Sequence, residues 1–244
     1  MIILAVITNL TLLTMDKLVR HIKFPLTFDV HRLKEDLDRV LSKKWTAHYN
    51  TGNYSGNWTS VALMSQNGKS DSIYAVPSDD GKLIATDALE ICDYFKEVLD
   101  GFPFEKTAVR LLQLEAGAEV KPHTDNDLGY EDGSFRLHIP IVTNSEVEFI
   151  LDGNRLEMKE GECWYINANF THSVANRGTV NRVHLVIDGL QNDWTDEMFY
   201  KEAPKENFDK PKPVISDEQK QLMIAELKRM DNPAALQLIK ELEQ

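Results

Sequence analysis

The sequence is short of positive charge, of cysteine and of long hydrophobic runs, and each shortage excludes a class of protein. Its 244 residues carry 27 Lys and Arg against 39 Asp and Glu, which gives a formal net charge of −12. Binding to nucleic acid or to an anionic membrane needs clustered basic residues, so neither is expected as the main partner. A local basic pocket for a small anionic ligand remains compatible with this charge.

The two cysteines, Cys92 and Cys163, are too few and too poorly spaced for a disulfide framework or a metal cluster. Both lie in apolar periodic segments, so we expect them to be buried free thiols. Free thiols are typical of a reducing compartment, and the sequence therefore predicts a cytoplasmic protein.

The most apolar run is residues 1–15, MIILAVITNLTLLTM. No Lys or Arg precedes it, no small-residue cleavage site follows it, and it is too short to span a bilayer as a helix. We interpret it first as an over-extended gene start, because Met15 begins a sensible soluble sequence. A buried N-terminal strand is the second interpretation and a weak signal anchor the last. No membrane association is expected.

Residues 16–106 predict helices and a loop region that pack on a β-rich core. Apolar residues recur at helical spacing over residues 30–43, and Asp29 is a plausible N-cap. Residues 86–99 predict a second helix, capped by its first residue, a threonine. Residues 50–80 are rich in Gly, Asn and Ser, which indicates a loop with short strands.

Over residues 107–190 the period of the hydrophobic pattern changes to two, and short β-rich runs alternate with turn signals. Seven or eight strands at this spacing favour a sandwich or barrel. Residues 191–213 are polar and punctuated by proline, and are expected to form a linker. Residues 214–244 predict a pair of helices, the first of which begins with a capping box of Ser216 and Gln219.

His123 and Asp125 are two residues apart, so on an extended strand their side chains leave by the same face. Such a pair is weak evidence for a metal site by itself. His172 strengthens it, because it follows a very apolar strand, although a hydrogen-bonded turn histidine is the alternative. Two histidines and one carboxylate leave the opposite face of a metal ion open, which is the arrangement of non-haem Fe(II) oxygenases.

Arg182 lies ten residues after His172, at the start of the alternating run Val183–Ile187. That alternation buries one face of the strand in the core and directs Arg182 to the other, into the interior of a small barrel. A buried arginine must pair with an anion, and its planar fork matches a carboxylate. No acidic residue is its obvious partner in the sequence, so a carboxylate of a ligand is expected there.

Several ordered motifs resemble those of the aspartyl/asparaginyl β-hydroxylase family, which includes bacterial proline hydroxylases. The resemblance covers roughly residues 50–190 and implies a mainly β double-stranded β-helix, a jelly-roll or cupin-like fold, with flanking N-terminal helices and a C-terminal helical appendage. It also implies Fe(II), 2-oxoglutarate and O₂. The motifs are RLLQLEAG at 110–117, PHTD at 122–125, RLHIP at 136–140, GECW at 161–164, HSVAN at 172–176 and RVHLVID at 182–188.

Position by position, the resemblance implies that His123, Asp125 and His172 ligate the iron. It places Arg182 at the distal carboxylate of 2-oxoglutarate and His138 near the other carboxylate end.

Two further residues are expected in substrate binding. Arg136 shares a strand face with His138 and would approach the co-substrate or the substrate, unless the two form an outward-facing salt-bridge pair. Trp58, beside the loop of residues 52–56, is a candidate lid residue, with a place in the core as the alternative.

The resemblance thus implies a 2-oxoglutarate-dependent dioxygenase that hydroxylates an amino acid and releases succinate and CO₂. The short N-terminal region and the C-terminal helices are more similar to the bacterial free-amino-acid hydroxylases, so a free, proline-like amino acid is the first expectation. Hydroxylation of Asp or Asn in a peptide or protein is the second. A non-catalytic, cupin-like metal-binding protein is the third. A homodimer formed through the C-terminal helices is also expected.

Overall fold

The structure is a computed structural model that describes residues 17–48, 50–74, 82–210, 217–230 and 233–242. The chain divides into two compact units, residues 19–209 and a second unit of residues 1–18 with 210–244. The expectations for residues 1–15 and for Ser216 lie outside the described residues.

The larger of two sheets in residues 19–209 has eight strands in the order β1-β11-β8-β13-β6-β4-β2, with β5 paired to β4. All of its strand pairs are antiparallel. Its strands are β1 (His21–Thr27), β2 (Thr46–Ala47), β4 (Trp58–Ser65), β5 (Ile84–Ala85), β6 (Lys106–Leu114), β8 (Ser134–Val142), β11 (Glu162–Ile166) and β13 (Arg182–Leu190).

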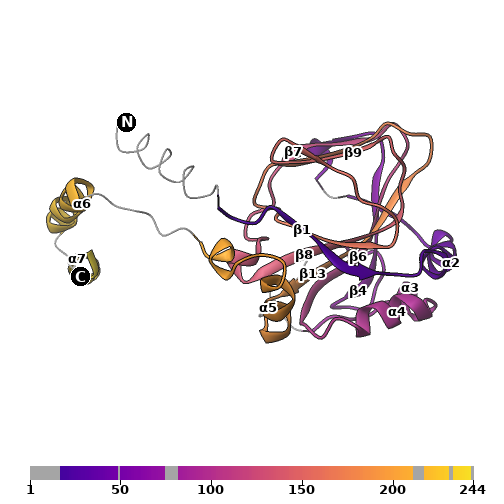
Figure 1. Ribbon diagram of the computed structural model, residues 1–244, viewed down its shortest axis with the longest axis horizontal. Helices are drawn as coiled ribbons and strands as arrows, with labels where there is room; N and C mark the ends of the chain where they lie inside the picture. The colour runs from indigo at the N-terminus through magenta and orange to yellow at the C-terminus, as the bar shows by residue number, and fades with distance from the viewer. Residues whose placement is uncertain (1–16, 49, 75–81, 211–216, 231–232, 243–244) are drawn as a thin grey trace. The chain divides into compact units, whose positions relative to one another are not determined.

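The smaller sheet has five strands in the order β10-β9-β12-β7-β3. In Figure 1 its strands β7 and β9 lie across the interior from β6, β8 and β13. Between residues 106 and 190 the eight strands β6–β13 divide equally between the two sheets, so the predicted double-stranded β-helix and its strand number are confirmed. The strands of the smaller sheet are β3 (Tyr54–Ser55), β7 (Glu119–His123), β9 (Val147–Leu151), β10 (Asn154–Leu156) and β12 (His172–Asn176).

The main hydrophobic core lies between the outer face of the larger sheet and a layer of helices. On β13 the residues of this face are Val183, Leu185 and Ile187, each at most 3% exposed. Leu33 and Phe95 from the helices belong to the same apolar cluster. Figure 1 shows two of the helices beneath this sheet and the most N-terminal one at its right-hand side. The helices of this layer are α2 (Val30–Leu41), α3 (Asp87–Glu90), α4 (Asp93–Asp100) and α5 (Asp193–Tyr200).

The inner face of the larger sheet is polar, because alternate residues of its central strands point to the other side. Register places Arg136 of β8 opposite Asp188 of β13, and His138 opposite Val186. The same alternation puts Arg182 and His184 on this inner face. One strand pattern therefore supplies both the core and the lining of the barrel interior.

The sequence predicted one continuous helix over residues 86–99. The structure has two short helices there, so that prediction was wrong. The chain breaks between α3 and α4 because the carboxylate of Asp36, on α2, accepts hydrogen bonds from the backbone N–H groups of Tyr94 and Phe95, each over 2.8 Å. A side chain distant in sequence thus caps the first turn of α4. Asp29 caps α2 as predicted, accepting from the N–H groups of the second and third residues of that helix.

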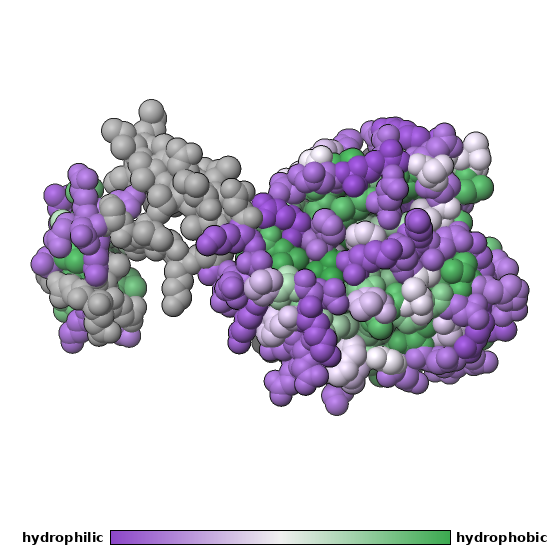
Figure 2. Space-filling view, viewed as in Figure 1, coloured by the Kyte–Doolittle hydropathy of each residue, from purple (hydrophilic) through white to green (hydrophobic). Residues whose placement is uncertain are grey.

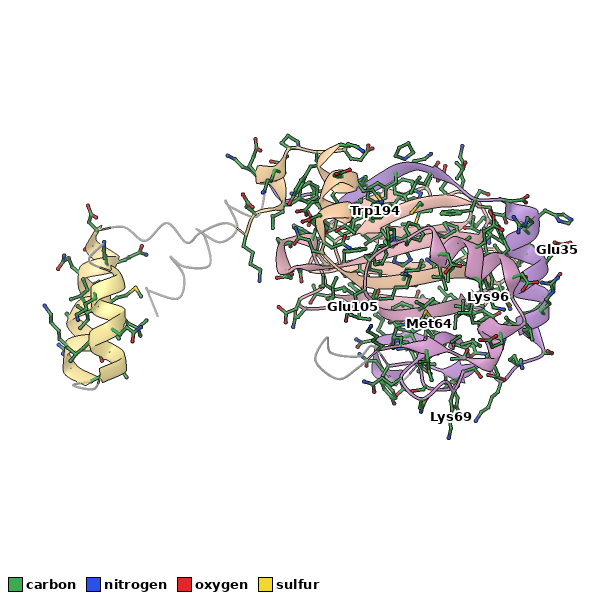
Figure 3. All side chains as sticks on the ribbon, turned by 90° about the horizontal axis from the view of Figure 1, so that it is seen from below. Glu35, Met64, Lys69, Lys96, Glu105 and Trp194 are labelled. Carbon is green, nitrogen blue, oxygen red and sulfur yellow. The ribbon has the colours of Figure 1, made fainter. Side chains whose placement is uncertain are left out.

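Two irregular regions expected from the sequence are more ordered than predicted. Residues 58–65, expected within a loop with short strands, form the buried eight-residue strand β4, which pairs with β6. Part of the expected linker 191–213 forms α5, which the side chains of Asn192 and Thr195 cap reciprocally. Phe199 of α5 is fully buried. Figure 3 labels Trp194 on α5 and Lys96 on α4.

The second unit contains the predicted pair of helices, α6 (Asp217–Met230) and α7 (Pro233–Leu242). Ile224 of α6 and Ile239 of α7 are buried, at 5% and 6% exposure. None of the helices in the described part of the chain combines the length and the hydropathy needed to cross a bilayer. Over residues 19–209, the face seen in Figure 2 is mostly hydrophilic with hydrophobic patches between.

Candidate metal centre

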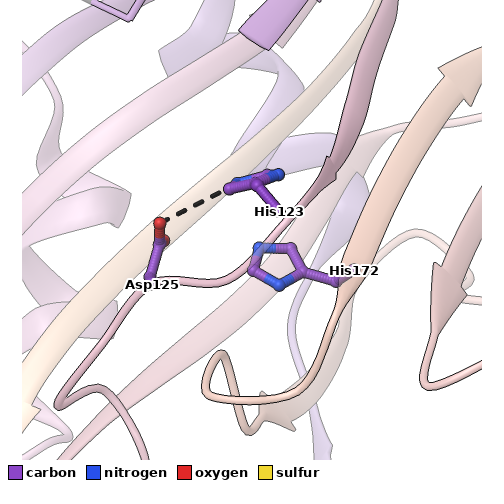
Figure 4. A group of neighbouring side chains, drawn as sticks. All are labelled: His123, Asp125 and His172. Carbon is purple, nitrogen blue, oxygen red and sulfur yellow. Dashed lines mark ion pairs between the residues drawn. The ribbon is translucent and has the colours of Figure 1, made fainter.

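His123, Asp125 and His172 come together at the mouth of the barrel, as the sequence predicted. His123 ends β7, His172 begins β12, and the two residues are direct partners in the antiparallel ladder. Asp125 follows β7, where its backbone N–H donates to Ala168 O over 2.9 Å. One ligand atom from each of the three side chains lies within 4.8 Å of the others, and Figure 4 shows them converging. The arrangement can hold one metal ion.

The two imidazoles are oriented for ligation by their own backbone. Nδ1 of His123 donates to Lys121 O over 2.8 Å, and Nδ1 of His172 donates to Phe170 O over 3.0 Å. A carbonyl only accepts, so in the neutral rings the proton lies on Nδ1 and the lone pair on Nε2. This contact fixes the tautomer and ring direction that metal ligation requires.

Burial and the positive charges nearby favour the protonation states of metal ligands. Burial, together with neighbouring His123, lowers the pKa of His172 to about 4, so this ring is neutral at pH 7. Burial would raise the pKa of the Asp125 carboxyl, but Arg136 and the two imidazoles outweigh it and hold that pKa below its ordinary value. Asp125 is therefore an anion and His172 a neutral donor.

Arg136 holds Asp125 in place from the opposite sheet. Its Nη1 donates to Asp125 Oδ2 over 2.7 Å, while Nε and Nη2 donate to the two oxygens of Asp188 over 2.6 and 2.9 Å. Asp188 also accepts from Arg110 Nη2 over 2.9 Å. Arg110 and Asp188 are buried, and the side chain of Arg136 is 14% exposed. Burial opposes the charge of Arg136, but the two carboxylates outweigh it and raise the pKa of Arg136 above its ordinary value. The outward salt-bridge alternative for Arg136 is thus wrong.

An inner cavity of about 80 Å³ adjoins the three candidate ligands. Arg136, His138 and Arg182 line it together with the triad, so the structure brings the predicted site residues to one place. His138 is 6% exposed, and burial with nearby Arg182 lowers the pKa of its imidazole well below the ordinary value. A neutral His138 faces the cavity.

Trp58 lines the same cavity, but as part of its wall. It is the first residue of β4, 9% exposed, and its ring stacks on His48 with centroids 3.6 Å apart. Of the two alternatives for Trp58, the structure shows the one in which the side chain is packed, and it gives no lid built on this residue. Its position still allows contact with a bound substrate.

Arg182 is almost fully buried, at 3% exposure, on the inner face of β13. It makes no ion pair with an acidic residue in the described part of the chain; Nη2 lies 2.8 Å from His184 Nδ1 instead. Burial lowers the pKa of the guanidinium to about 9. The sequence predicted that Arg182 would lack an acidic partner within the chain, and in the described part of the folded barrel it does.

A second cavity, of about 520 Å³, lies against Arg182 and His184 and is lined further by Phe149 and residues 155–160. The three candidate metal ligands do not line it. Arg182 and Phe149 line both cavities, so these two side chains lie at their boundary.

Sequence reasoning missed four polar residues of the site, His48, Arg110, His184 and Asp188. The alternation on β13 could have indicated His184 and Asp188, because both share the face of Arg182. His48 and Arg110 had no such signal, since only the pairing of β4 with β6 and the packing of the preceding loop bring them to the cavity.

The thiols of Cys92 and Cys163 are free and buried, as predicted. Burial raises the pKa of each to about 12, so neither is a nucleophile at neutral pH.

The chain matches L-proline cis-4-hydroxylase of Rhizobium meliloti (strain 1021) with 28% identity over 164 residues, 66% of this chain. The match spans 57% of the length of that relative.

Two solved structures are similar to the chain at low identity. An oxidoreductase of the 2OG-Fe(II) oxygenase family from Burkholderia pseudomallei has 13% identity and a TM-score of 0.49, covering 76% of this chain and 92% of its own. The epimerase SnoN, solved in complex with Fe3+, alpha ketoglutarate and nogalamycin RO, has 15% identity and a TM-score of 0.46, covering 87% of this chain and 97% of its own.

The family model for aspartyl/asparaginyl beta-hydroxylase matches residues 27–192. This segment contains both sheets except part of β1, and all the candidate site residues. The resemblance found in the sequence is therefore confirmed, and the chain belongs to the aspartyl/asparaginyl β-hydroxylase family.

Proposed function

We propose that the protein is an Fe(II)- and 2-oxoglutarate-dependent hydroxylase of an amino acid. The observation that carries this proposal is the convergence of His123, Asp125 and His172 within 4.8 Å, with both imidazoles held at Nδ1 by backbone carbonyls. Two nitrogen donors and one carboxylate oxygen suit Fe(II) and leave positions for other ligands. The residues present thus fit the metal.

The side chains that line the barrel interior support the proposal that 2-oxoglutarate binds there. Arg182 is a buried cation that lacks an acidic partner among the described residues, and His138 Nδ1 also has no hydrogen-bond partner there. A buried polar group without a partner is costly, and a dicarboxylate supplies acceptors. Arg182 would bind the distal carboxylate, and His138 would lie near the other end.

Bound iron and 2-oxoglutarate would together activate O₂ for attack on a C–H bond, so that one oxygen atom enters succinate, the other enters the hydroxylated product, and CO₂ is released. The chain itself positions and shields the reactants. Arg136 keeps one oxygen of Asp125 engaged so that Oδ1, 3.8 Å from His123 Nε2, faces the metal position. The stacked rings of Trp58 and His48 form one wall of the cavity and would shield that side of a bound substrate.

A free, proline-like amino acid is the favoured substrate, because the similar Rhizobium protein is described as acting on L-proline. An Asp or Asn residue in a peptide is the second candidate, favoured by the family description. Incubating the Fe(II)-loaded protein with 2-oxoglutarate and a panel of free amino acids and short peptides tests both. A mass gain of one oxygen on a free amino acid, with matching succinate, is expected. No succinate with any member of the panel would indicate a non-catalytic metal-binding protein.

A further inference from the structure

Arg182 and His184 lie two residues apart on the inner face of β13 and contact each other side by side. Arg182 Nη2 is 2.8 Å from His184 Nδ1. A guanidinium has only donors, so Nδ1 of His184 must be the acceptor in this contact. The geometry therefore assigns the tautomer of a histidine that the sequence did not single out.

The proton of His184 then lies on Nε2. Burial, together with neighbouring Arg182, lowers the pKa of the His184 imidazole well below its ordinary value, which keeps the ring neutral. A neutral ring that accepts at Nδ1 donates at Nε2. No described residue accepts from His184 Nε2 or from Arg182 Nε, although both side chains are at least 97% buried.

Two adjacent buried donors without an acceptor are costly, because each loses its hydrogen bond to water and gains none in return. A carboxylate is the matching ligand, since it has two oxygens and a negative charge that complements Arg182. A neutral carbonyl or hydroxyl would satisfy one donor and leave the guanidinium without a counter-charge.

We propose that His184 completes a two-donor carboxylate site, in which Arg182 Nε–H and His184 Nε2–H bind one carboxylate together. The inference rests on the proposed function, under which this carboxylate is the distal end of 2-oxoglutarate. It deepens that function, because His184 becomes a residue that determines specificity for the co-substrate. The second cavity offers another source of the same chemistry, a small carboxylate such as succinate that enters beside His184 without the metal.

The test measures binding of 2-oxoglutarate to the full chain, loaded with Zn(II), by titration calorimetry. His184→Phe keeps a ring of similar shape but removes the donor, and the Kd for 2-oxoglutarate is expected to rise about tenfold or more. His184→Gln restores a side chain that can accept from Arg182 and donate onward, and it should recover part of the affinity. Met158→Leu, which changes another residue lining the second cavity but no donor, should bind as the wild type does.

Proton NMR gives a second readout, in which ligand binding is measured on the Zn(II)-loaded wild type itself. The Nε2–H resonance of His184, assigned by its loss in His184→Phe, should move when 2-oxoglutarate binds. Movement with succinate in the absence of metal, but none with 2-oxoglutarate, would identify an independent carboxylate site in the second cavity, and it would overturn the assignment to the co-substrate.

The failures of the inference and of the proposed function are distinguishable. If the metal-loaded wild type does not bind 2-oxoglutarate, the proposed function is wrong. If it binds, but His184→Phe has the wild-type Kd and the Nε2–H resonance does not move, the function stands and His184 is not a ligand of the carboxylate.

Discussion

Arg136 donates from Nη1 to Asp125 Oδ2 over 2.7 Å and thereby ties the candidate metal ligand on one side of the barrel to the larger sheet on the other. The guanidinium is itself held by Asp188, which Arg110 also contacts. A chain of alternating charges thus runs from the interior of the sheet to the metal position. Arg110 and Asp188 are buried and Arg136 is mostly so, and we infer that the orientation of the ligand depends on this network.

Arg136→Lys is therefore expected to weaken metal binding by about 10- to 100-fold, because a single ammonium cannot hold both carboxylates. Competition with a chelator measures the metal affinity, and a thermal melt checks the fold. Asp188→Asn is the companion variant, and it should destabilise the protein by about 3–5 kcal/mol, because buried Arg110 and the mostly buried Arg136 lose their shared carboxylate. Wild-type metal affinity in Arg136→Lys would show that Asp125 is oriented without Arg136.

Replacing His123 or His172 by Ala is expected to abolish turnover while leaving the fold largely intact, because both side chains line a cavity. Asp125→Ala should be the mildest of the three for metal binding, since two imidazoles remain. Metal content after dialysis and a circular dichroism melt, measured beside succinate release, separate loss of the metal from loss of the fold. Near-normal turnover in either histidine variant would contradict the metal assignment.

Arg182→Ala should raise the apparent KM for 2-oxoglutarate far more than it changes metal affinity. The variant loses a charge-assisted contact of about 2–4 kcal/mol. Arg182→Lys should recover only part, because an ammonium does not reproduce the planar fork. A 2-oxoglutarate titration that is unchanged in Arg182→Ala would make the arginine purely structural.

The metal-free protein should lose stability as the pH falls from 7 to 5. Burial, the larger effect, and nearby Arg110 lower the pKa of His48 in the folded state to about 4. Unfolded histidine titrates near 6.5, so in this window the unfolded chain takes up protons that the folded chain does not, and a lower pH favours unfolding. His48 alone should contribute about 2 kcal/mol by pH 5.

Urea unfolding at pH 7, 6 and 5 measures this effect, and His48→Phe is the matched control. It keeps a ring that can stack on Trp58 but removes the titrating group, so its stability should depend less on pH than that of the wild type. If the free energy of unfolding changed equally with pH in the two proteins, His48 would have to accept a proton in the folded state.

Removal of the C-terminal helices tests the expected homodimer. Large apolar side chains on α6 and α7, such as Leu222 and Leu236, are more than half exposed. We expect a chain that ends at Lys210 to run as a monomer in size-exclusion chromatography with light scattering, and the full chain to run as a dimer. Equal masses for the two would contradict a role of these helices in assembly.

The sequence by itself predicted a sandwich or barrel and a candidate metal site, because both depend on local pattern. The resemblance to a family then implied the double-stranded β-helix and the co-substrate. Alternation of apolar and polar residues makes a strand with two different faces, and it predicted the inward direction of Arg182. The spacing of His123 and Asp125 likewise put two ligands on one side of the chain. Helix α2 followed from the same kind of information, since apolar spacing and an N-cap are local signals.

Only the tertiary structure decided which distant residues meet. Asp36 breaks the expected helix over residues 86–99 because α2 packs beside it, and nothing near that break predicts the contact. The order of strands places Asp188 between Arg110 and Arg136, and the contact of His184 with Arg182 sets which nitrogen carries a proton. These relationships depend on sheet register and burial, which are properties of the folded chain and not of any short segment.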